Sequence, residues 1–283
     1  MVPEHSRERD GRHGSLEEPA VPQANGRLSF LCDKAARERQ SGGMFDLIRE
    51  GPLARLTLNR PAARNAVPVG AWSHLGDAAE AASAEGASLL LLEGAGSAFC
   101  AGADITDFKA MHADAAAAGA FRAAMRDGIE RLAAVPIPTI ALIHGPCYGA
   151  GVALAMACDL RLAGADSSFA ITPAKFGISY PQEDIARLVG LVGPGQAARL
   201  LYSGATIDAA EALRIGLAEL PASAAEDLIA GICENSADSI AALKRSIRLA
   251  AEVVATDTDQ DRSFDRLLAS DALAARLARR KER

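Results

Sequence analysis

The order of apolar and polar residues predicts alternating strands and helices from Met44 onward. FDLIRE (45–50) and LARLTLN (53–59) show the alternation of strands, and Gly51 and Pro52 between them predict a hairpin. ASLLLLEG (87–94) and TIALIHG (139–145) are apolar runs of the length expected for buried strands. Two shorter strands are predicted in LRLAG (160–164) and SSFAITP (167–173).

Helical patterns follow these strands. We expect helices over residues 69–85, over 114–135 with an end at Pro136, and over 148–159. Beyond Pro181 the chain becomes mostly helical, with separate helices predicted over 182–192, 194–204, 208–216 and 223–236. The pattern therefore predicts an α/β core over 44–190 and a helical C-terminal region over 191–283.

Residues 1–43 differ from the rest of the chain. They carry charges of both signs and lack the apolar run of a secretory signal. We expect a disordered extension there, and a simple explanation is that translation starts at Met44.

The composition of the chain argues against several classes of function. Among 283 residues the net charge is -6 and aromatic residues make up 4%, which argues against a nucleic-acid partner. Five cysteines form no CxxC pair, so neither a disulfide framework nor a metal site is expected, and a cytoplasmic location fits best. The uncharged stretch 135–158 holds three prolines and three glycines, so we expect no membrane association.

Two segments share one design that could support catalysis. Residues 89–108 and 139–151 each run from a buried strand through a loop of small residues to the expected start of a helix. Small residues let a ligand approach the main chain, and N–H groups at a helix N-terminus have no partner within the helix. Two such groups aimed at one point would bind an oxyanion, although close helix–strand packing is an alternative reason for the small residues. Fingerprints of dinucleotide binding are weak (GAGSAF, GPGQAA), and no P-loop or G-x-S-x-G motif is present.

Several motifs together resemble the enoyl-CoA hydratase/isomerase (crotonase) family. They are LNRPAARNAV (58–67), SAFCAGADI (97–105), HGPCYGAGVALAMACDLRLA (144–163) and the late ALKRSIR (242–248). The resemblance implies a crotonase-like ββα spiral with a helical C-terminal region that forms homotrimers or hexamers. It also implies acyl-CoA thioester substrates, with coenzyme A as part of the substrate and no separate cofactor.

By motif position, the resemblance assigns the two oxyanion donors to the N–H groups of Ala103 and Ala150. Asp104 is expected to cap the following helix. The residues that would line the substrate cleft are Ala62, Ala63, Arg64, Ala101, Gly102, Asp104, Ile105, Tyr148, Gly149, Pro173 and Tyr180.

The chain departs from the family pattern at the proton-transfer positions. Hydratases of the family use two glutamates, and the matching residues here are Ala153 and Pro173. Neither can move a proton, so ordinary two-glutamate hydration is not expected. Glu183 and Asp184 are the remaining candidates for a single-carboxylate proton shuttle, and their alternative role is to stabilise the first turn of a helix.

Other residues near these motifs have more ordinary explanations. Tyr180 could donate a hydrogen bond, His144 is expected to be a core histidine, and Cys147 could face the ligand or only pack. Phe264 comes too early to match the family phenylalanine that contacts the adenine. Three hypotheses remain: an acyl-CoA enzyme that catalyses double-bond isomerisation or a related enolate reaction, a thioester-binding protein without catalysis, and a trimeric scaffold.

Overall fold

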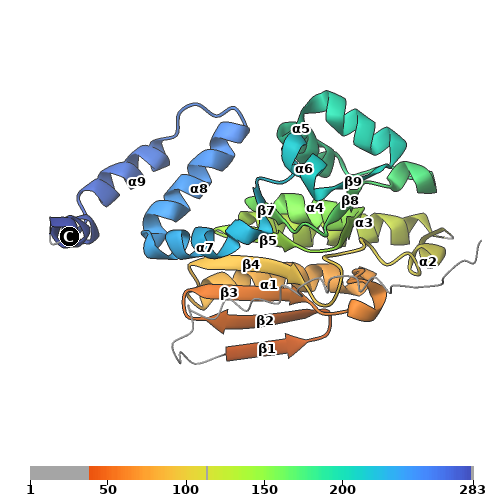
Figure 1. The fold of residues 1–283 in the computed structure, drawn as a ribbon, viewed down its shortest axis with the longest axis horizontal. Helices are drawn as coiled ribbons and strands as arrows, with labels where there is room; N and C mark the ends of the chain where they lie inside the picture. The colour runs from red at the N-terminus through yellow and green to blue at the C-terminus, as the bar shows by residue number, and fades with distance from the viewer. Residues whose placement is uncertain (1–37, 113, 282–283) are drawn as a thin grey trace, which may run out of the picture.

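A seven-stranded sheet forms the body of the molecule in the computed structural model, which describes residues 38–112 and 114–281 (Figure 1). The first three strands are antiparallel, as the predicted hairpin requires, and the rest run parallel. In sheet order they are β1 (Glu38–Gly42), β2 (Phe45–Glu50), β3 (Leu53–Leu58), β4 (Leu89–Gly94), β5 (Thr139–Ile143), β7 (Leu160–Ala163) and β10 (Leu220–Pro221).

Helices bury both faces of this sheet, which explains the four consecutive leucines of β4. Leu90 and Leu92 belong to the core shared with α1 (Trp72–Ala84) and α3 (Ala115–Ala134), which follows the short α2 (Phe108–His112). Leu89 and Leu91 pack in a second core, on the opposite face of the sheet, with Ile229 of α7 (Ala225–Glu234). Successive strand residues point to opposite faces, so a strand covered on both sides is apolar throughout.

A smaller three-stranded sheet lies beside the parallel strands. It consists of β6 (Pro146–Tyr148), β8 (Ser168–Ala170) and β9 (Thr206–Asp208). Around it lie α4 (Ala150–Ala157), α5 (Gln182–Ser203) and α6 (Ala209–Ile215) (Figure 1). The label α5 covers the two helices predicted over 182–192 and 194–204, which meet at a kink because Gly193 has non-helical backbone angles and Pro194 follows it.

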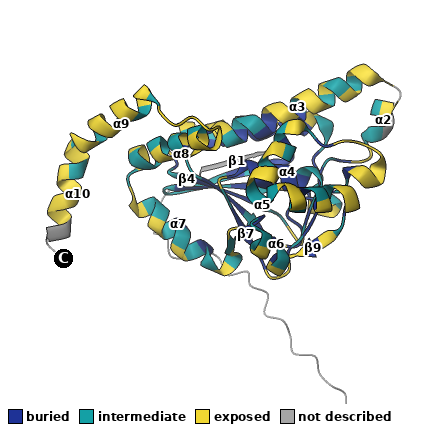
Figure 2. Cartoon of the chain, turned by 90° about the horizontal axis from the view of Figure 1, so that it is seen from above, coloured by how far each residue is buried: buried dark blue, intermediate teal, exposed yellow. Residues whose placement is uncertain are grey.

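The last three helices form an arm that leaves the body. Helices α8 (Ala237–Ala251), α9 (Thr258–Leu268) and α10 (Asp271–Lys281) extend beyond α7, and the outer two are mostly exposed (Figure 2). Lys244 anchors α8 to the body, because its Nζ lies 2.8 Å from Asp159 and donates to the carbonyl oxygen of Ile137.

The predicted fold class is confirmed, but the predicted boundaries of the regions differ from the structure. Strand β1 lies within the expected extension 1–43, and it pairs with β2 through main-chain hydrogen bonds that a polar sequence can make. The boundary at residue 190 falls inside α5, and β9 and β10 beyond it complete both sheets. The expectation of disorder for residues 1–37 lies outside the described residues, as does Cys32.

Candidate active site

The loop after β4 is held against the segment 60–67 by hydrogen bonds on both sides of Ala103. Val67 N donates to Gly102 O at 2.8 Å, and Asp104 N donates to Val67 O at 3.0 Å. In such a bridge the N–H of the middle residue points the other way. The N–H of Ala103 is therefore turned away from this segment.

The side chain of Asn65 forms hydrogen bonds with the same loop. Its side chain is fully buried and donates to Ala95 O at 2.9 Å and to Ala98 O at 2.7 Å, while its Oδ1 accepts from Arg60 N at 2.9 Å. Arg64 O accepts a hydrogen bond from Ala101 N at 2.9 Å. Ala62 and Ala63, in the 3₁₀ turn η1 (Pro61–Ala63), precede Arg64, so all three cleft residues predicted here lie beside the loop of Ala103.

The second predicted donor, Ala150, is the first residue of α4. The preceding Gly149 has φ 52° and ψ -120°, a conformation that residues with a side chain rarely adopt. Carbonyl Gly149 O accepts from Val152 N at 3.0 Å, whereas the N–H of Ala150 belongs to the first turn and has no partner within the helix.

The two loops are in direct contact. Cys100 and Cys147 form a parallel bridge, in which Cys100 N donates to Pro146 O at 3.1 Å and Tyr148 N donates to Cys100 O at 2.9 Å. A Cβ atom added to Gly102 would lie 2.8 Å from Tyr148 O and 3.2 Å from Ala150 N. Gly102, next to Ala103, therefore packs directly against the start of α4.

Both N–H groups are without an acceptor in the part of the chain that the structure describes. Among hydrogen bonds within the described residues, none has the backbone N–H of Ala103 or Ala150 as its donor. Two loops in contact thus each carry one backbone N–H without an acceptor among the described residues, and two such donors aimed at one point would stabilise an oxyanion.

Asp104 has a structural role rather than an exposed position in a cleft. Its carboxylate pairs with Arg60, and it accepts from Thr106 N at 3.0 Å and from Thr106 Oγ1 at 2.7 Å. The hydrogen bonds from Arg60 and Thr106 lower the pKa of Asp104 to about 2. It closes a turn before α2 instead of capping that helix, and the next residue, Ile105, is 60% exposed.

The structure places no acid at either hydratase glutamate position. Ala153 is fully buried in α4, and Pro173 is buried at the start of η3 (Pro173–Phe176). Tyr180 Oη donates to Gly149 O at 2.9 Å, which places this hydroxyl at the first turn of α4. Burial raises the pKa of Tyr180, and the nearby Asp184 raises it further, so the phenol stays protonated.

Glu183 and Asp184 differ sharply in environment although both lie in the first turn of α5. Glu183 is partly exposed and pairs with Arg126 of α3. Asp184 is 3% exposed, and burial raises its pKa to about 6 despite the charge of Arg187 at 3.4 Å. A carboxyl group that titrates near neutral pH is suited to accept and return a proton.

One further prediction near the site is wrong, and of the two alternatives for Cys147 the structure shows packing. His144 is exposed rather than in the core, and its Nδ1 lies 3.1 Å from the Asp166 carboxylate. Cys147 is fully buried, and burial raises the pKa of its thiol, so it does not present a reactive thiolate. The charged partners Arg126, Glu130 and Arg187 were not expected, because they are brought together only by the packing of α3 against α5.

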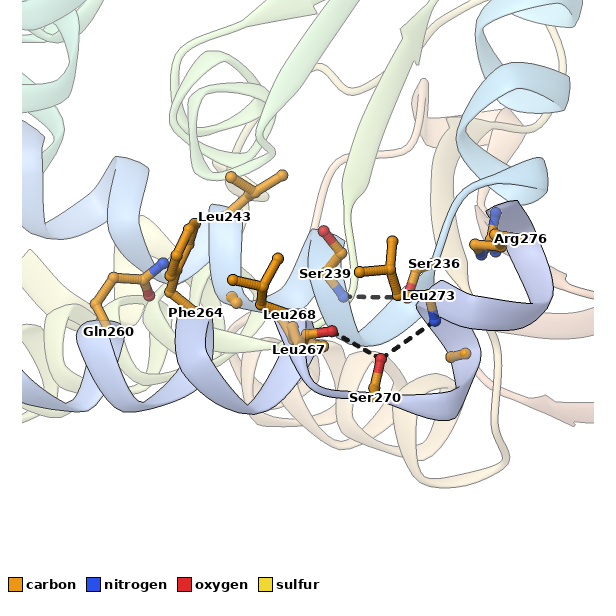
Figure 3. Close-up of a pocket in the computed structure, with 12 residues that line it drawn as sticks. Ser236, Ser239, Leu243, Gln260, Phe264, Leu267, Leu268, Ser270, Leu273 and Arg276 are labelled. Carbon is orange, nitrogen blue, oxygen red and sulfur yellow. Dashed lines mark hydrogen bonds between the residues drawn. The ribbon is translucent and has the colours of Figure 1, made fainter. Parts of the chain in front are cut away.

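An apolar groove of about 320 Å³ lies on the C-terminal arm, apart from these loops (Figure 3). Helices α8, α9 and α10 form it, and Leu243, Phe264, Leu268 and Leu273 contribute its apolar surface. In residues 38–112 and 114–281 no group of three or more potential metal ligands is present, and no helix is long and apolar enough to cross a bilayer.

Comparison with known proteins identifies the family of the chain. The family model for enoyl-CoA hydratase/isomerase matches residues 49–275. A Mycobacterium tuberculosis protein named "Probable enoyl-CoA hydratase echA14" is 33% identical over 80% of this chain and 93% of its own length. The "Crotonyl-CoA hydratase" of Syntrophomonas wolfei is 38% identical over 60% of this chain and 66% of its own.

Solved structures give the same result. An enoyl-CoA hydratase/isomerase family protein of Hyphomonas neptunium superimposes with a TM-score of 0.79 at 35% identity, over 85% of this chain and 95% of its own. A Thermobifida fusca protein, solved in complex with acetoacetyl-CoA, has a TM-score of 0.70 at 29% identity, over 83% and 95% of the two chains. The chain belongs to the enoyl-CoA hydratase/isomerase (crotonase) family.

Proposed function

We propose that the protein binds an acyl-CoA thioester and stabilises its enolate between the backbone N–H groups of Ala103 and Ala150. The observation that carries this proposal is the pair of unused N–H groups on two loops in contact. The acetoacetyl-CoA complex of the Thermobifida fusca relative supports the ligand class. Each donor would contribute roughly 3–4 kcal/mol to stabilisation of the anion.

The favoured reaction is double-bond isomerisation or a related enolate reaction. In an isomerisation, the ionised carboxylate takes a proton from C2 of a 3-enoyl thioester as the electrons move onto the thioester oxygen. The same carboxyl group then returns that proton to C4, and the double bond comes to rest between C2 and C3. One proton moves within the substrate, so neither a cofactor nor a second acid is needed.

Asp184 is the better of the two candidates for this carboxylate. Glu183 is engaged with Arg126 at the partly exposed side of α5, whereas Asp184 is buried and titrates near neutral pH. Tyr180 supports the placement of Asp184 near the thioester. The Tyr180 hydroxyl contacts Gly149 O, and its ring is close enough to Asp184 for the carboxylate to affect the pKa of the phenol.

Substrate entry requires side chains of α3 to shift. Asp184 borders a void of about 10 Å³ beside Met125 and Ile129, which has room for roughly one water molecule. An acyl group would reach Asp184 only after these side chains shift. The coenzyme A portion would pass along Ala62, Ala63 and Arg64, with Ala101, Gly102, Tyr148 and Gly149 beside the thioester.

The proposal is tested with Asp184→Asn and Glu183→Gln on a panel of 3-enoyl and 2-enoyl thioesters. We expect Asp184→Asn to abolish isomerisation while acetoacetyl-CoA still binds in calorimetry, and Glu183→Gln to keep most of the turnover. Full turnover by Asp184→Asn would reject its role as proton carrier. Hydration of 2-enoyl thioesters at a rate comparable with isomerisation would reject the favoured reaction.

The alternative function is thioester binding without catalysis. Ala153 and Pro173 favour it, because both positions of the hydratase acids are apolar and buried. It predicts binding of acetoacetyl-CoA with no product from any thioester of the panel. A trimeric scaffold with an unused cleft predicts no binding at all.

We further propose that the arm packs on a second copy of the chain, in a homotrimer or hexamer. Phe264 is 64% exposed and Leu268 61% exposed on α9, which is a large apolar surface for a monomer to leave in water. Sedimentation velocity should give a trimer or hexamer, and Phe264→Asp together with Leu268→Asp should give smaller species. A monomeric wild-type protein would contradict this assembly.

A further inference from the structure

Two ion pairs join α3 to α5 at adjacent turns. Arg126 and Glu130 lie four residues apart on α3, and Glu183 and Arg187 lie four residues apart on α5. Arg126 pairs with Glu183, and Arg187 Nη2 lies 2.8 Å from each carboxylate oxygen of Glu130. Nitrogen Nη2 thus donates to both carboxylate oxygens of Glu130, and these charge-assisted hydrogen bonds hold the Arg187 guanidinium against that carboxylate.

Asp184 lies between these pairs. Its Oδ1 is 3.4 Å from Arg187 Nη1, so one guanidinium contacts Glu130 through one nitrogen and Asp184 through another. The void beside Asp184 is lined by the apolar residues Met125, Ile129 and Pro181 and by the charged residues Arg126, Glu130 and Glu183. Among the described residues, Arg187 is the one cation within ion-pair distance of the Asp184 carboxylate.

We infer that Arg187 is a positioning residue that orients the Asp184 carboxylate, and that Glu130 holds Arg187 in place for this purpose. This inference rests on the proposed role of Asp184 as proton carrier. It explains how the carboxylate is held in one orientation. If the buried carboxylate rotated away from C2 and C4 of the substrate, proton transfer would stop although every reactive group was still present.

The charges around Asp184 predict how its pKa changes when each partner is replaced. The charged or titratable groups that face Asp184 are Arg187 and Glu183 on its own helix, Glu130 and Arg126 on α3, and Tyr180 before α5. Burial raises the pKa of Asp184 most, Arg187 lowers it, and Glu130 and Glu183 raise it. The two members of one ion pair thus act on Asp184 in opposite directions.

The experiment measures the titration of Asp184 by ¹³C NMR of the full-length protein labelled at aspartate side chains. The Asp184 signal is assigned by its loss in Asp184→Asn. We expect Arg187→Gln to raise the pKa of Asp184 by about 1 unit and Glu130→Gln to lower it. Arg199→Gln is the matched control, because Arg199 is also on α5 and pairs with Glu211 at 2.7 Å, and it should leave this pKa unchanged.

Arg187→Lys separates position from charge. It keeps one positive charge but has a single nitrogen, which cannot contact Glu130 and Asp184 through two separate nitrogens as Arg187 does, so we expect a pKa for Asp184 near the wild-type value and a kcat at least about 10-fold lower with KM little changed. Equal kcat in Arg187→Lys and wild type would overturn the positioning role. So would shifts of the Asp184 pKa in the same direction in Arg187→Gln and Glu130→Gln.

The titration does not depend on turnover, so the two proposals fail separately. If the two shifts appear but Asp184→Asn retains full isomerisation, the cluster orients Asp184 and the proposed proton carrier is wrong. If the shifts are absent while Asp184→Asn is inactive, the proton carrier stands and Arg187 is not its positioning residue. Thermal melts of all variants check that each is folded.

Discussion

The hydroxyl of Tyr180 donates a hydrogen bond to the carbonyl oxygen of Gly149, the residue directly before the second proposed donor. Tyr180→Phe removes this bond at a buried carbonyl and should lower the free energy of unfolding by about 1 kcal/mol. Because the bond steadies the start of α4, we also expect a fall in kcat with little change in KM. Urea denaturation and steady-state kinetics measure both. Wild-type values for both would show that the hydroxyl has no role.

Gly102 lies where the two loops touch, and its φ of 102° favours glycine. An alanine there would be strained, and its Cβ would lie 2.8 Å from Tyr148 O and 3.2 Å from Ala150 N. We expect Gly102→Ala to separate the loops and to lower kcat/KM by roughly 100-fold, the effect of losing one oxyanion donor. Gly190→Ala is the control, since Gly190 lies in α5 with no atom within 4 Å of an added Cβ. Equal kinetics in the two variants would argue that the loop contact is irrelevant to turnover.

Asn65 supports the first donor loop through two hydrogen bonds, one to the buried carbonyl group of Ala98 and one to the partly buried carbonyl group of Ala95. Asn65→Ala leaves Ala95 O and Ala98 O without this donor, and each loss should lower the free energy of unfolding by about 1–3 kcal/mol. Asn59→Ala is a suitable control, because its side-chain amide donates an exposed hydrogen bond to Asp46 at 2.7 Å. Chemical denaturation of both variants tests the expectation, and similar stabilities would refute it.

Asp184 should make stability depend on pH with a defined sign. Its pKa rises from 3.8 to about 6 on folding, so its favourable contribution is complete below pH 3.8 and is lost as the pH rises through about 6. Asp184→Asn cannot ionise and escapes this loss. The free energy of unfolding of Asp184→Asn, relative to wild type, should therefore increase by about 2 kcal/mol between pH 4 and pH 7.5.

Urea titrations of the two proteins across this range provide the measurement. The difference between them isolates Asp184, because all other carboxyl groups are shared. A difference that stays flat or declines with rising pH would show that Asp184 is already ionised at low pH in the folded protein.

The sequence predicts the local elements well because each has a local cause. The leucines of β4, the small residues at Gly149 and Ala150 and the proline after α3 all act on their own segment. The motif that contains Asn65 was recognised, yet its hydrogen bonds to Ala95 and Ala98 depend on a loop thirty residues away. The charge cluster around Asp184 could not be foreseen, since it forms only where ion pairs join α3 to the first turns of α5.

Exposure was equally hard to foresee from sequence. His144 follows an apolar strand and has the context of a core residue, but the strand ends there and the ring meets Asp166 at the surface. Conversely, Glu183 and Asp184 are adjacent in sequence but lie on different sides of α5, which gives their carboxylates different environments.

The most direct test of the central claim is a crystal structure of the protein with acetoacetyl-CoA. The account predicts that the thioester oxygen lies about 2.7–3.1 Å from the backbone nitrogens of both Ala103 and Ala150. A bound ligand whose thioester oxygen contacts neither nitrogen, or only one of them, would contradict it.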